Sequence, residues 1–308
     1  PLILADRFMQ LHHMTQGRAM FGAGPGALVS DAKMMGIETD RQRDMMEEAL
    51  EDILKLFRGE TVTHETDWYT LKNARLQLRP YGNQPIDVVT ASMMSPSGPN
   101  AAGRLGTGLL SMSASAAPAL KVAGTNWDLA CEVAAEHGNT MDRSQWRMIG
   151  LVHVAETREQ AIADVQFGIE DWVRYFEDVA VIPMIPPERR GDPVAHLMDS
   201  GHAAIGTPDE VIKQVESLWE SSQGGFGCFL ITDHNWTSRE AKLNSYEMVA
   251  RHVFPHFQGH NIQREESNAW VRDSQKDFKA SHNQATAKQI ERHNKQQDAK
   301  AKSKSAAE

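Results

Sequence analysis

Apolar and polar residues follow two different periods along the first 260 residues of the chain. Apolar residues recur at helical intervals over residues 2–14 and 45–57, with polar residues between them. Short continuous apolar runs bounded by Gly, Pro or Ser indicate buried strands. The five expected strands are residues 19–24, 85–92, 108–113, 147–155 and 227–232. The alternation of strands and helices predicts a parallel α/β fold, with the strands in sequence order in one continuous sheet that is curved like part of a barrel.

Three sequence signals mark where helices should begin between these strands. Thr157–Gln160 and Thr237–Glu240 match the capping box, in which a Ser or Thr and a Glu or Gln three residues later satisfy free N–H groups. Thr207–Glu210 adds a Pro at the first helical position and acids in the first turn. The helix after Thr157 should run towards Val179, and the helix after Thr237 should reach about His256.

Two segments depart from the α/β pattern. Residues 182–192 are Pro-rich and predict a long loop or lid, with Arg189 and Arg190 in its exposed part. From Gly259 onward the chain is polar, so we expect a core domain over 1–258 and a C-terminal extension over 259–308. The last 20 or so residues are expected to be disordered or marginally helical.

Composition narrows the class of protein. The chain has 308 residues, 41% of them hydrophobic, and a net charge of −9. Residues 259–308 hold 10 Lys and Arg and 7 Asp and Glu. Residues 1–258 therefore hold 22 basic and 34 acidic residues, a net charge of −12. An acidic core is a poor nucleic-acid surface, and we interpret the basic tail as a solvated extension rather than a partner site. No apolar run reaches the roughly 20 residues that span a bilayer.

The two cysteines, Cys131 and Cys228, do not suggest a disulfide framework, which favours a reducing, cytoplasmic location. The sequence opens inside an α/β repeat, and five strands do not close an eight-stranded barrel. We therefore expect a (β/α)8 barrel that lacks its first three or so βα units.

Two turns that follow expected strands carry candidate binding residues. Gly22, Gly24 and Gly26 are spaced G-x-G-x-G, which differs from the dinucleotide fingerprint G-x-G-x-x-G and fits a tight turn equally well. Ser92 and Ser95 follow the second expected strand where a helix begins. Hydroxyls and unpaired N–H groups at a helix start can hold a phosphate, although simple helix capping by Ser97 or Ser95 is the alternative.

Five segments, taken together and in order, resemble one known family. They are LADRFMQLHHMTQGRAMFGAGPG, DAKMMGI with the helix after it, WYTLKNARLQLRPY, VVTASMMSPSGPNAAGRLG, and AIGTPDEVIKQVE followed by GGFGCFLI. The chain resembles the luciferase-like flavin-dependent monooxygenases, and most closely their limonene and alkane monooxygenase-like branch. The resemblance covers residues 2 to about 257.

The resemblance implies a TIM-like barrel, usually dimeric, whose active site lies at the carboxyl ends of its strands. It implies reduced FMN supplied by a separate flavin reductase, O2, and a small apolar organic substrate. Some relatives use a deazaflavin for hydride transfer, so a deazaflavin-dependent oxidoreductase is one alternative. A non-catalytic flavin-binding or dimerisation paralogue is another.

The resemblance also assigns cofactor-binding positions. It places Gly24, Pro25 and Gly26 beside the flavin. The family position that matches Ser92 contacts the flavin phosphate, and Ser95 falls close to another contact.

Met112 matches a position where relatives place a large side chain against the flavin ring, with core packing as the equal alternative. His153 is expected to be a core or pocket-wall residue rather than a base. No catalytic residue can be assigned, and the histidines show no metal-ligand spacing.

Overall fold

The computed structural model describes residues 1–93, 95–112, 117–260 and 262–305. These residues divide into two compact units, Pro1–Val253 and Phe254–Glu308. The domain boundary expected from composition, between residues 258 and 259, lies close to this division and stays a prediction.

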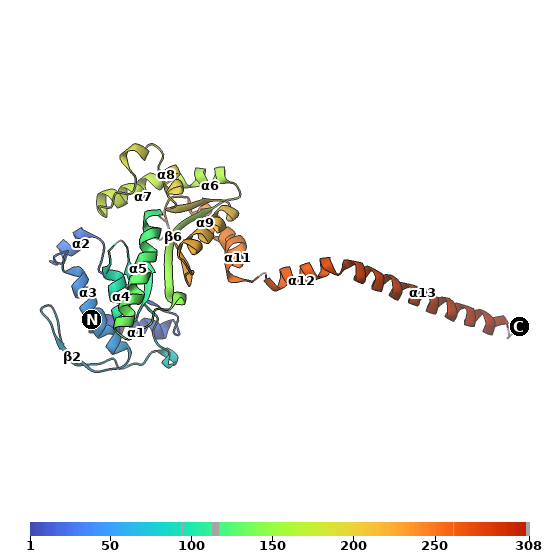
Figure 1. Ribbon diagram of the computed structural model, residues 1–308, viewed down its shortest axis with the longest axis horizontal. Helices are drawn as coiled ribbons and strands as arrows, with labels where there is room; N and C mark the ends of the chain where they lie inside the picture. Colours follow the sequence, from blue (N-terminus) through green and yellow to red (C-terminus); the bar gives the residue numbers. More distant parts are fainter. Residues whose placement is uncertain (94, 113–116, 261, 306–308) are drawn as a thin grey trace. The chain divides into compact units, whose positions relative to one another are not determined.

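A curled sheet of six parallel strands forms the centre of the first unit (Figure 1). The strands are β1 (Phe21–Ala23), β4 (Val88–Ser92), β5 (Gly108–Ser111), β6 (Trp146–Val154), β7 (Ala203–Gly206) and β8 (Cys228–Thr232). All five expected strands are present, and β7 was not predicted. The prediction of a parallel, curved sheet is confirmed.

The strand order differs in one respect from the sequence order that the alternation predicts. The path runs β1-β4-β5-β6-β7, but β8 pairs with β6 and not with β7. Residues 147–151 of β6 pair with β8, whereas residues 151–154 pair with β7. A strand of nine residues is long enough to take two short neighbours, and apolar patterning does not encode which neighbour is chosen.

Helices cover the sheet. They are α1 (Leu2–Met14), α2 (Val29–Met34), α3 (Gln42–Phe57), α4 (Ser97–Leu105), α5 (Ala117–Glu136), α6 (Arg158–Val165), α7 (Ile169–Arg174), α8 (Pro193–Asp199), α9 (Pro208–Ser221) and α10 (Arg239–Met248). The first core cluster joins α1 and α3 to β1 and β4 through buried apolar residues such as Met9, Leu50 and Phe21. A second cluster joins α4, α5 and α9 to β5 and β6, where Trp127 stacks on Trp146.

A two-stranded antiparallel hairpin packs beside α3. Its strands are β2 (Val62–Glu65) and β3 (Thr70–Ala74), and neither was predicted. Short helical turns complete this unit: η1 (Tyr81–Asn83), η2 (Arg143–Gln145), η3 (Tyr175–Val179), η4 (Pro187–Arg189) and η5 (Val249–Val253).

The predicted helix starts are largely confirmed. Thr157 accepts a hydrogen bond from the Gln160 N–H at 3.2 Å. The capping box at Thr207 forms, with its N–H 2.8 Å from Glu210 Oε2. The third start is shifted by one residue, because Ser238 caps α10. The helix expected to run from Thr157 towards Val179 is interrupted after Val165, where the Gly168 N–H bonds to the Trp236 carbonyl at 2.7 Å.

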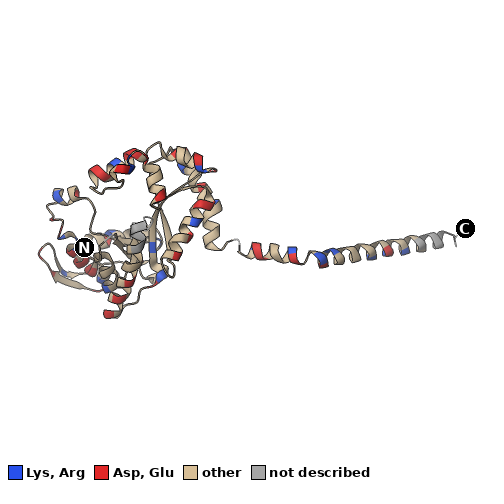
Figure 2. Cartoon of the chain, turned by 45° about the horizontal axis from the view of Figure 1, so that its top comes forward, with Lys and Arg blue, Asp and Glu red and all other residues tan. Residues whose placement is uncertain are grey.

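The second unit is made of three helices joined by short turns in its described residues. It contains α11 (Phe254–Gln258), α12 (Ile262–Asp273) and α13 (Gln275–Ser305). Acidic and basic residues are interspersed along α12 and α13 (Figure 2). Trp270 and Phe278 contact each other edge to face at 5.0 Å across the junction of α12 and α13.

Candidate functional site at the carboxyl ends of β1, β4 and β5

The turn after β1 is held by a side chain from α3. The Gln42 amide donates a hydrogen bond to the Pro25 carbonyl at 3.1 Å. Gly26 has a φ of +86°, a conformation that other residues rarely adopt. A Cβ placed on Gly24 would lie 3.4 Å from the Ala91 side chain, so this turn lies beside the end of β4. The predicted turn of Gly24, Pro25 and Gly26 is therefore a fixed loop at the carboxyl edge of the sheet.

Ser92, the last residue of β4, is 3% exposed and faces α5. Its hydroxyl oxygen accepts a hydrogen bond from the Asn126 amide at 3.1 Å. The hydroxyl proton of Ser92 can still donate to another group. Asn126 is itself buried, and the sequence reasoning missed it, although an Asn on the inner face of a helix is a signal for a polar partner in the core.

The first turn of α4 begins directly after β4. The N-cap residue is Pro96, which makes no side-chain cap. The hydroxyls of Ser95 and Ser97 instead lie 2.9 Å from each other, so the capping alternative for these two serines is wrong. Because Pro99 has no N–H, Ser97 and Gly98 carry the first-turn N–H groups that have no acceptor within the helix.

Gly98 allows α4 to approach the end of β4 closely. A Cβ at this position would lie 2.4 Å from the Ala91 carbonyl oxygen, closer than real Cβ contacts allow. The N-terminal end of α4 is consequently pressed against the strand end that carries Ser92. The hydroxyls of Ser95 and Ser97 and the N–H groups of Ser97 and Gly98 therefore lie together in a segment without a basic side chain.

Met112 follows β5 and is 42% exposed. Its N–H donates to the Ser92 carbonyl at 2.8 Å, and Ser92 pairs with Ser111 in the register of β4 and β5. The structure therefore brings all the predicted cofactor-binding residues to the ends of three adjacent strands. Whether they bind a cofactor stays a prediction.

His153 lies in the core at the end of β6. It is fully buried, and its Nε2 lies 3.1 Å from Asp164 Oδ2. Burial lowers the pKa of His153, and burial lowers the pKa of the neighbouring His234 to about 4. Both rings are therefore neutral near pH 7. This environment agrees with the expectation that His153 is a core residue and not an accessible general base.

The Pro-rich loop is anchored rather than detached. Ile185 is 2% exposed and packs in the core cluster of α6, α7 and α8. Arg190 forms an ion pair with Glu177 at 2.7 Å, and Arg189 pairs with Asp199. Both arginines are exposed, as predicted.

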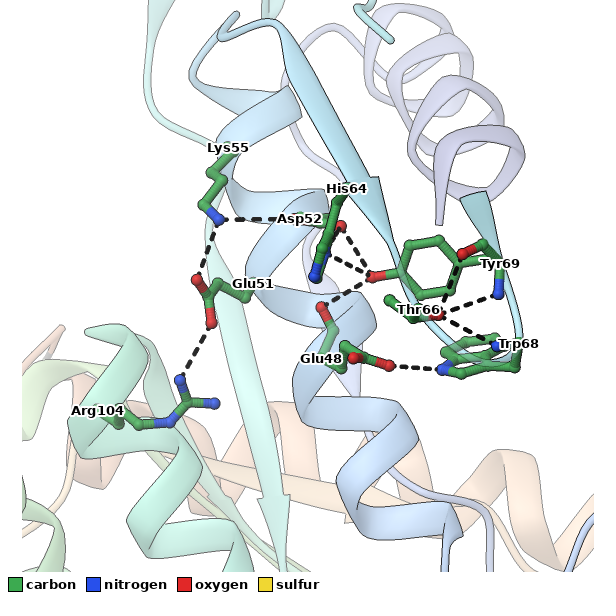
Figure 3. A network of polar contacts seen from close by, with 9 residues as sticks. All are labelled: Glu48, Glu51, Asp52, Lys55, His64, Thr66, Trp68, Tyr69 and Arg104. Carbon is green, nitrogen blue, oxygen red and sulfur yellow. Dashed lines mark hydrogen bonds and ion pairs between the residues drawn. The ribbon is translucent and has the colours of Figure 1, made fainter. Parts of the chain in front are cut away.

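A polar network ties the hairpin to α3, and the sequence reasoning missed it (Figure 3). Asp52 is 1% exposed, and one carboxylate oxygen accepts hydrogen bonds from His64 Nδ1 and the Tyr69 hydroxyl, each at 2.8 Å. Burial alone would raise the pKa of Asp52, but these two hydrogen bonds, together with the electrostatic attraction of His64 and Lys55, hold the pKa below its usual value. Asp52 is therefore a buried carboxylate in a helix whose other acidic residues are exposed or partly exposed.

Comparison with known proteins assigns the chain to a family. The family model for luciferase-like monooxygenases matches residues 1–224. The chain is 42% identical to limonene 1,2-monooxygenase of Rhodococcus erythropolis over 263 residues, which are 84% of this chain and 66% of that protein. It is 37% identical to 4-hydroxyprotoasukamycin monooxygenase of Streptomyces nodosus subsp. asukaensis, over 88% of this chain and 74% of that protein. The chain belongs to the luciferase-like monooxygenase family, and it spans about two thirds of the length of the limonene enzyme.

Solved structures agree on the fold. The monooxygenase RslO1 from Streptomyces bottropensis superposes with a TM-score of 0.67 at 20% identity, over 83% of this chain and 74% of that chain. The oxygenating constituent of 3,6-diketocamphane monooxygenase from Pseudomonas putida, solved in complex with FMN, superposes with a TM-score of 0.63 at 24% identity. This superposition covers 83% of this chain and 75% of that chain. Within the described residues, no helix is both long and apolar enough to cross a membrane.

Proposed function

We propose that this chain is the oxygenating component of a flavin-dependent monooxygenase that acts on a small apolar organic substrate. The 42% identity to limonene 1,2-monooxygenase over most of the chain carries this proposal. The proposal includes reduced FMN delivered by a separate flavin reductase, O2 as the oxidant, and a homodimer. We also propose a core domain over 1–258, an extension over 259–308 and a cytoplasmic location.

The geometry at the start of α4 fits the phosphate of FMN. The Ser95 and Ser97 hydroxyls lie 2.9 Å apart, and the first-turn N–H groups of α4 have no acceptor within the helix. The Ser92 hydroxyl can donate while its oxygen accepts from Asn126. These residues would hold the phosphate, and Gly24, Pro25, Gly26 and Met112 would line the flavin ring.

A bound reduced flavin would supply the electrons that activate O2, with one oxygen atom entering the substrate and the other leaving as water. The chain's own contribution is to hold the cofactor and to keep water away from the reacting oxygen. Met112, at the end of β5, offers an apolar side chain for the second task.

The experiment compares FMN with riboflavin, which lacks the phosphate. Ser92→Ala and Ser95→Ala, singly and together, should weaken FMN binding by about ten- to a hundred-fold, because each loses a hydrogen bond to a charged group worth about 1.5–3 kcal/mol. Riboflavin binding should stay nearly unchanged. Ser217→Ala, on the exposed face of α9, is the matched control. Equal losses for both ligands would mean that the serines shape the ring pocket or the fold.

A deazaflavin-dependent oxidoreductase is a second candidate. The chain is 25% identical to an F420-dependent glucose-6-phosphate dehydrogenase of Nakamurella multipartita, over 86% of this chain and 69% of that protein. Substrate oxygenation that requires O2 and reduced FMN supports the first proposal, and hydride transfer from a reduced deazaflavin without O2 supports the second. Flavin binding without either reaction would indicate a non-catalytic paralogue.

A further inference from the structure

A groove of about 630 Å³ lies beside the start of α10, in the region that follows the carboxyl end of β8. We call it the α10 groove. Two segments form it: the residues around the start of α7, and the loop that joins β8 to α10. They are held together by the hydrogen bond from Gly168 to the Trp236 carbonyl, and a Cβ on Gly168 would lie only 2.3 Å from the Asn235 carbonyl oxygen. The groove side chains include Phe167, Asp171, Thr237, Arg239, Lys242 and Leu243.

The α10 groove is separate from the candidate flavin site. It shares no lining residue with the turn after β1, the start of α4 or Met112. Its lining residues all come from residues 167–243, and both segments that form it are fully described. A ligand in this groove would therefore not take the place of the flavin.

The start of α10 carries hydrogen-bond donors without partners. Ser238 caps the helix by accepting a hydrogen bond from the Ala241 N–H at 3.2 Å. The N–H groups of Arg239 and Glu240 have no acceptor among the described residues. Such N–H groups, together with the positive end of the helix dipole, favour a negatively charged ligand.

A buried hydroxyl in the same place gives independent evidence for a ligand. Thr237 lines the groove and is 5% exposed, and its Oγ1 has no hydrogen-bond partner within the described part of the chain. A buried hydroxyl without a partner is destabilising, and buried polar groups are almost always paired with protein, water or a ligand. Thr237 comes two residues before the first of the free N–H groups, so one ligand can reach both.

The charges around the groove favour an anion. Arg239 is exposed, and its guanidinium has no partner among the residues that the structure describes. Lys242 lies 3.0 Å from Asp233, and Asp171, which supplies a carboxylate to the lining, is paired with Arg174. Arg239 therefore supplies a positive charge that no ion pair neutralises.

We propose that the α10 groove binds a phosphate monoester that carries an apolar organic group. A phosphate has three acceptor oxygens and nearly two negative charges at pH 7, so it can bind the Thr237 hydroxyl, the free N–H groups and the Arg239 guanidinium together. Phe167 and Leu243 are 76% and 53% exposed and would contact the apolar group of the ligand. This site goes beyond the proposed monooxygenase activity and does not depend on it.

Calorimetric titration of the 308-residue chain with phenyl phosphate tests the proposal. Phenyl phosphate should bind saturably, and both inorganic phosphate and benzoate should bind more weakly at the same ionic strength. In amide NMR spectra, the N–H signals of Arg239 and Glu240 should shift during the titration. Absence of saturable binding, benzoate or inorganic phosphate binding as tightly as phenyl phosphate, or shifts confined to Ser97 and Gly98 would overturn the proposal.

Variants of the groove locate the phosphate. Arg239→Gln should weaken phenyl phosphate binding about tenfold or more, because a hydrogen bond between two charged groups is lost. Thr237→Val should weaken it severalfold, whereas the unfolding midpoint without ligand should not fall, because the hydroxyl has no protein partner to lose. Arg251→Gln, at an exposed arginine outside the groove, is the charge-matched control and should bind within about twofold of the parent chain. A lower midpoint in Thr237→Val, or equal losses in the two arginine variants, would contradict the assignment.

The double variant Ser92→Ala and Ser95→Ala separates this site from the flavin site. Phenyl phosphate binding should be the same in this variant as in the parent chain. A loss in the serine variant without a loss in Arg239→Gln would place the phosphate at the start of α4 and overturn the proposal. If the serine variant binds FMN as well as the parent does but Arg239→Gln loses phenyl phosphate, the flavin site is wrong and the α10 groove stands.

Discussion

At the residue scale, the buried carboxylate of Asp52 determines how firmly the hairpin is held on α3. The Tyr69 hydroxyl donates to it at 2.8 Å, and burial together with this contact raises the pKa of Tyr69, so the proton stays in place at any ordinary pH. Tyr69→Phe should lower the free energy of unfolding by about 1.5–3 kcal/mol, because a hydrogen bond to a charged group is lost. Urea titration measures this loss. Tyr81→Phe, at a 43% exposed tyrosine, is the control and should change little.

His234 makes stability depend on pH. Burial lowers its folded-state pKa from 6.5 to about 4, so the unfolded chain binds this proton first as the pH falls. Stability should therefore decrease from about pH 6.5 and level off below about pH 4. The two pKa values differ by an amount equivalent to about 3 kcal/mol. His234→Asn should flatten the pH profile of the unfolding midpoint, whereas His137→Asn, on the surface, should leave it unchanged. An identical slope in both variants would contradict the assignment.

At the element scale, contact between α4 and β4 depends on the absence of one side chain. Gly98→Ala would place a Cβ 2.4 Å from the Ala91 carbonyl and push the helix away from the strand. We expect a loss of about 1–3 kcal/mol, together with weaker FMN binding if the phosphate lies at this helix start. Gly124→Ala is the matched control in α5, because its Cβ would meet nothing within 4 Å. There Ala should stabilise the helix by about 0.5–1 kcal/mol, which thermal unfolding would detect.

The sequence predicts most elements of the sheet because buried strands are strongly apolar. Strand β7 was missed because Ala203–Gly206 is only four residues long and lacks a run of large apolar residues. The hairpin was missed because β2, with the sequence VTHE, has one buried residue in four. The pairing of β8 with β6 depends on register between distant segments, which local periodicity does not contain.

In the candidate site, too, some features could be predicted from the sequence and others could not. The positions at the strand ends follow from strand boundaries and family resemblance, and the structure places them at one edge of the sheet. The side chains that form hydrogen bonds with these positions could not be predicted in this way. Gln42 lies 17 residues from its partner Pro25, and Asn126 lies 34 residues from its partner Ser92. Asp52 was hidden within a helix whose other acids are exposed or partly exposed, and only the hairpin explains its burial.

At the scale of the whole molecule, α12 and α13 should contribute little to the stability of the first unit. Most described residues of α12 and α13 are exposed, and neither helix has a buried residue among those described. A chain ending at Gln258 should therefore keep the unfolding midpoint of the parent within about 1 °C, since almost no buried area is removed. Calorimetry measures this midpoint. A drop of several degrees would mean that the extension contributes to the stability of the core.

Exposed apolar side chains near the start of the chain also have a consequence for solubility. Several large apolar residues are exposed on α1, in the segment before β1, and on or directly after α2, among them Leu4, Met20, Met34 and Met35. Exposed apolar side chains of this kind promote association where they form a continuous surface. We expect the isolated chain to bind a hydrophobic dye such as ANS or to aggregate at micromolar concentration.

The double variant Met34→Lys and Met35→Lys tests the source of this behaviour. It should reduce dye fluorescence severalfold, because two exposed apolar side chains are replaced by charges. Leu243→Lys alters a residue that is 53% exposed on α10 and should leave the signal nearly unchanged. A parent chain that stays monomeric, unfolds cooperatively and binds no dye would show that the exposed apolar residues do not form a continuous surface in solution. Equal effects of the two changes would place the dye elsewhere on the molecule.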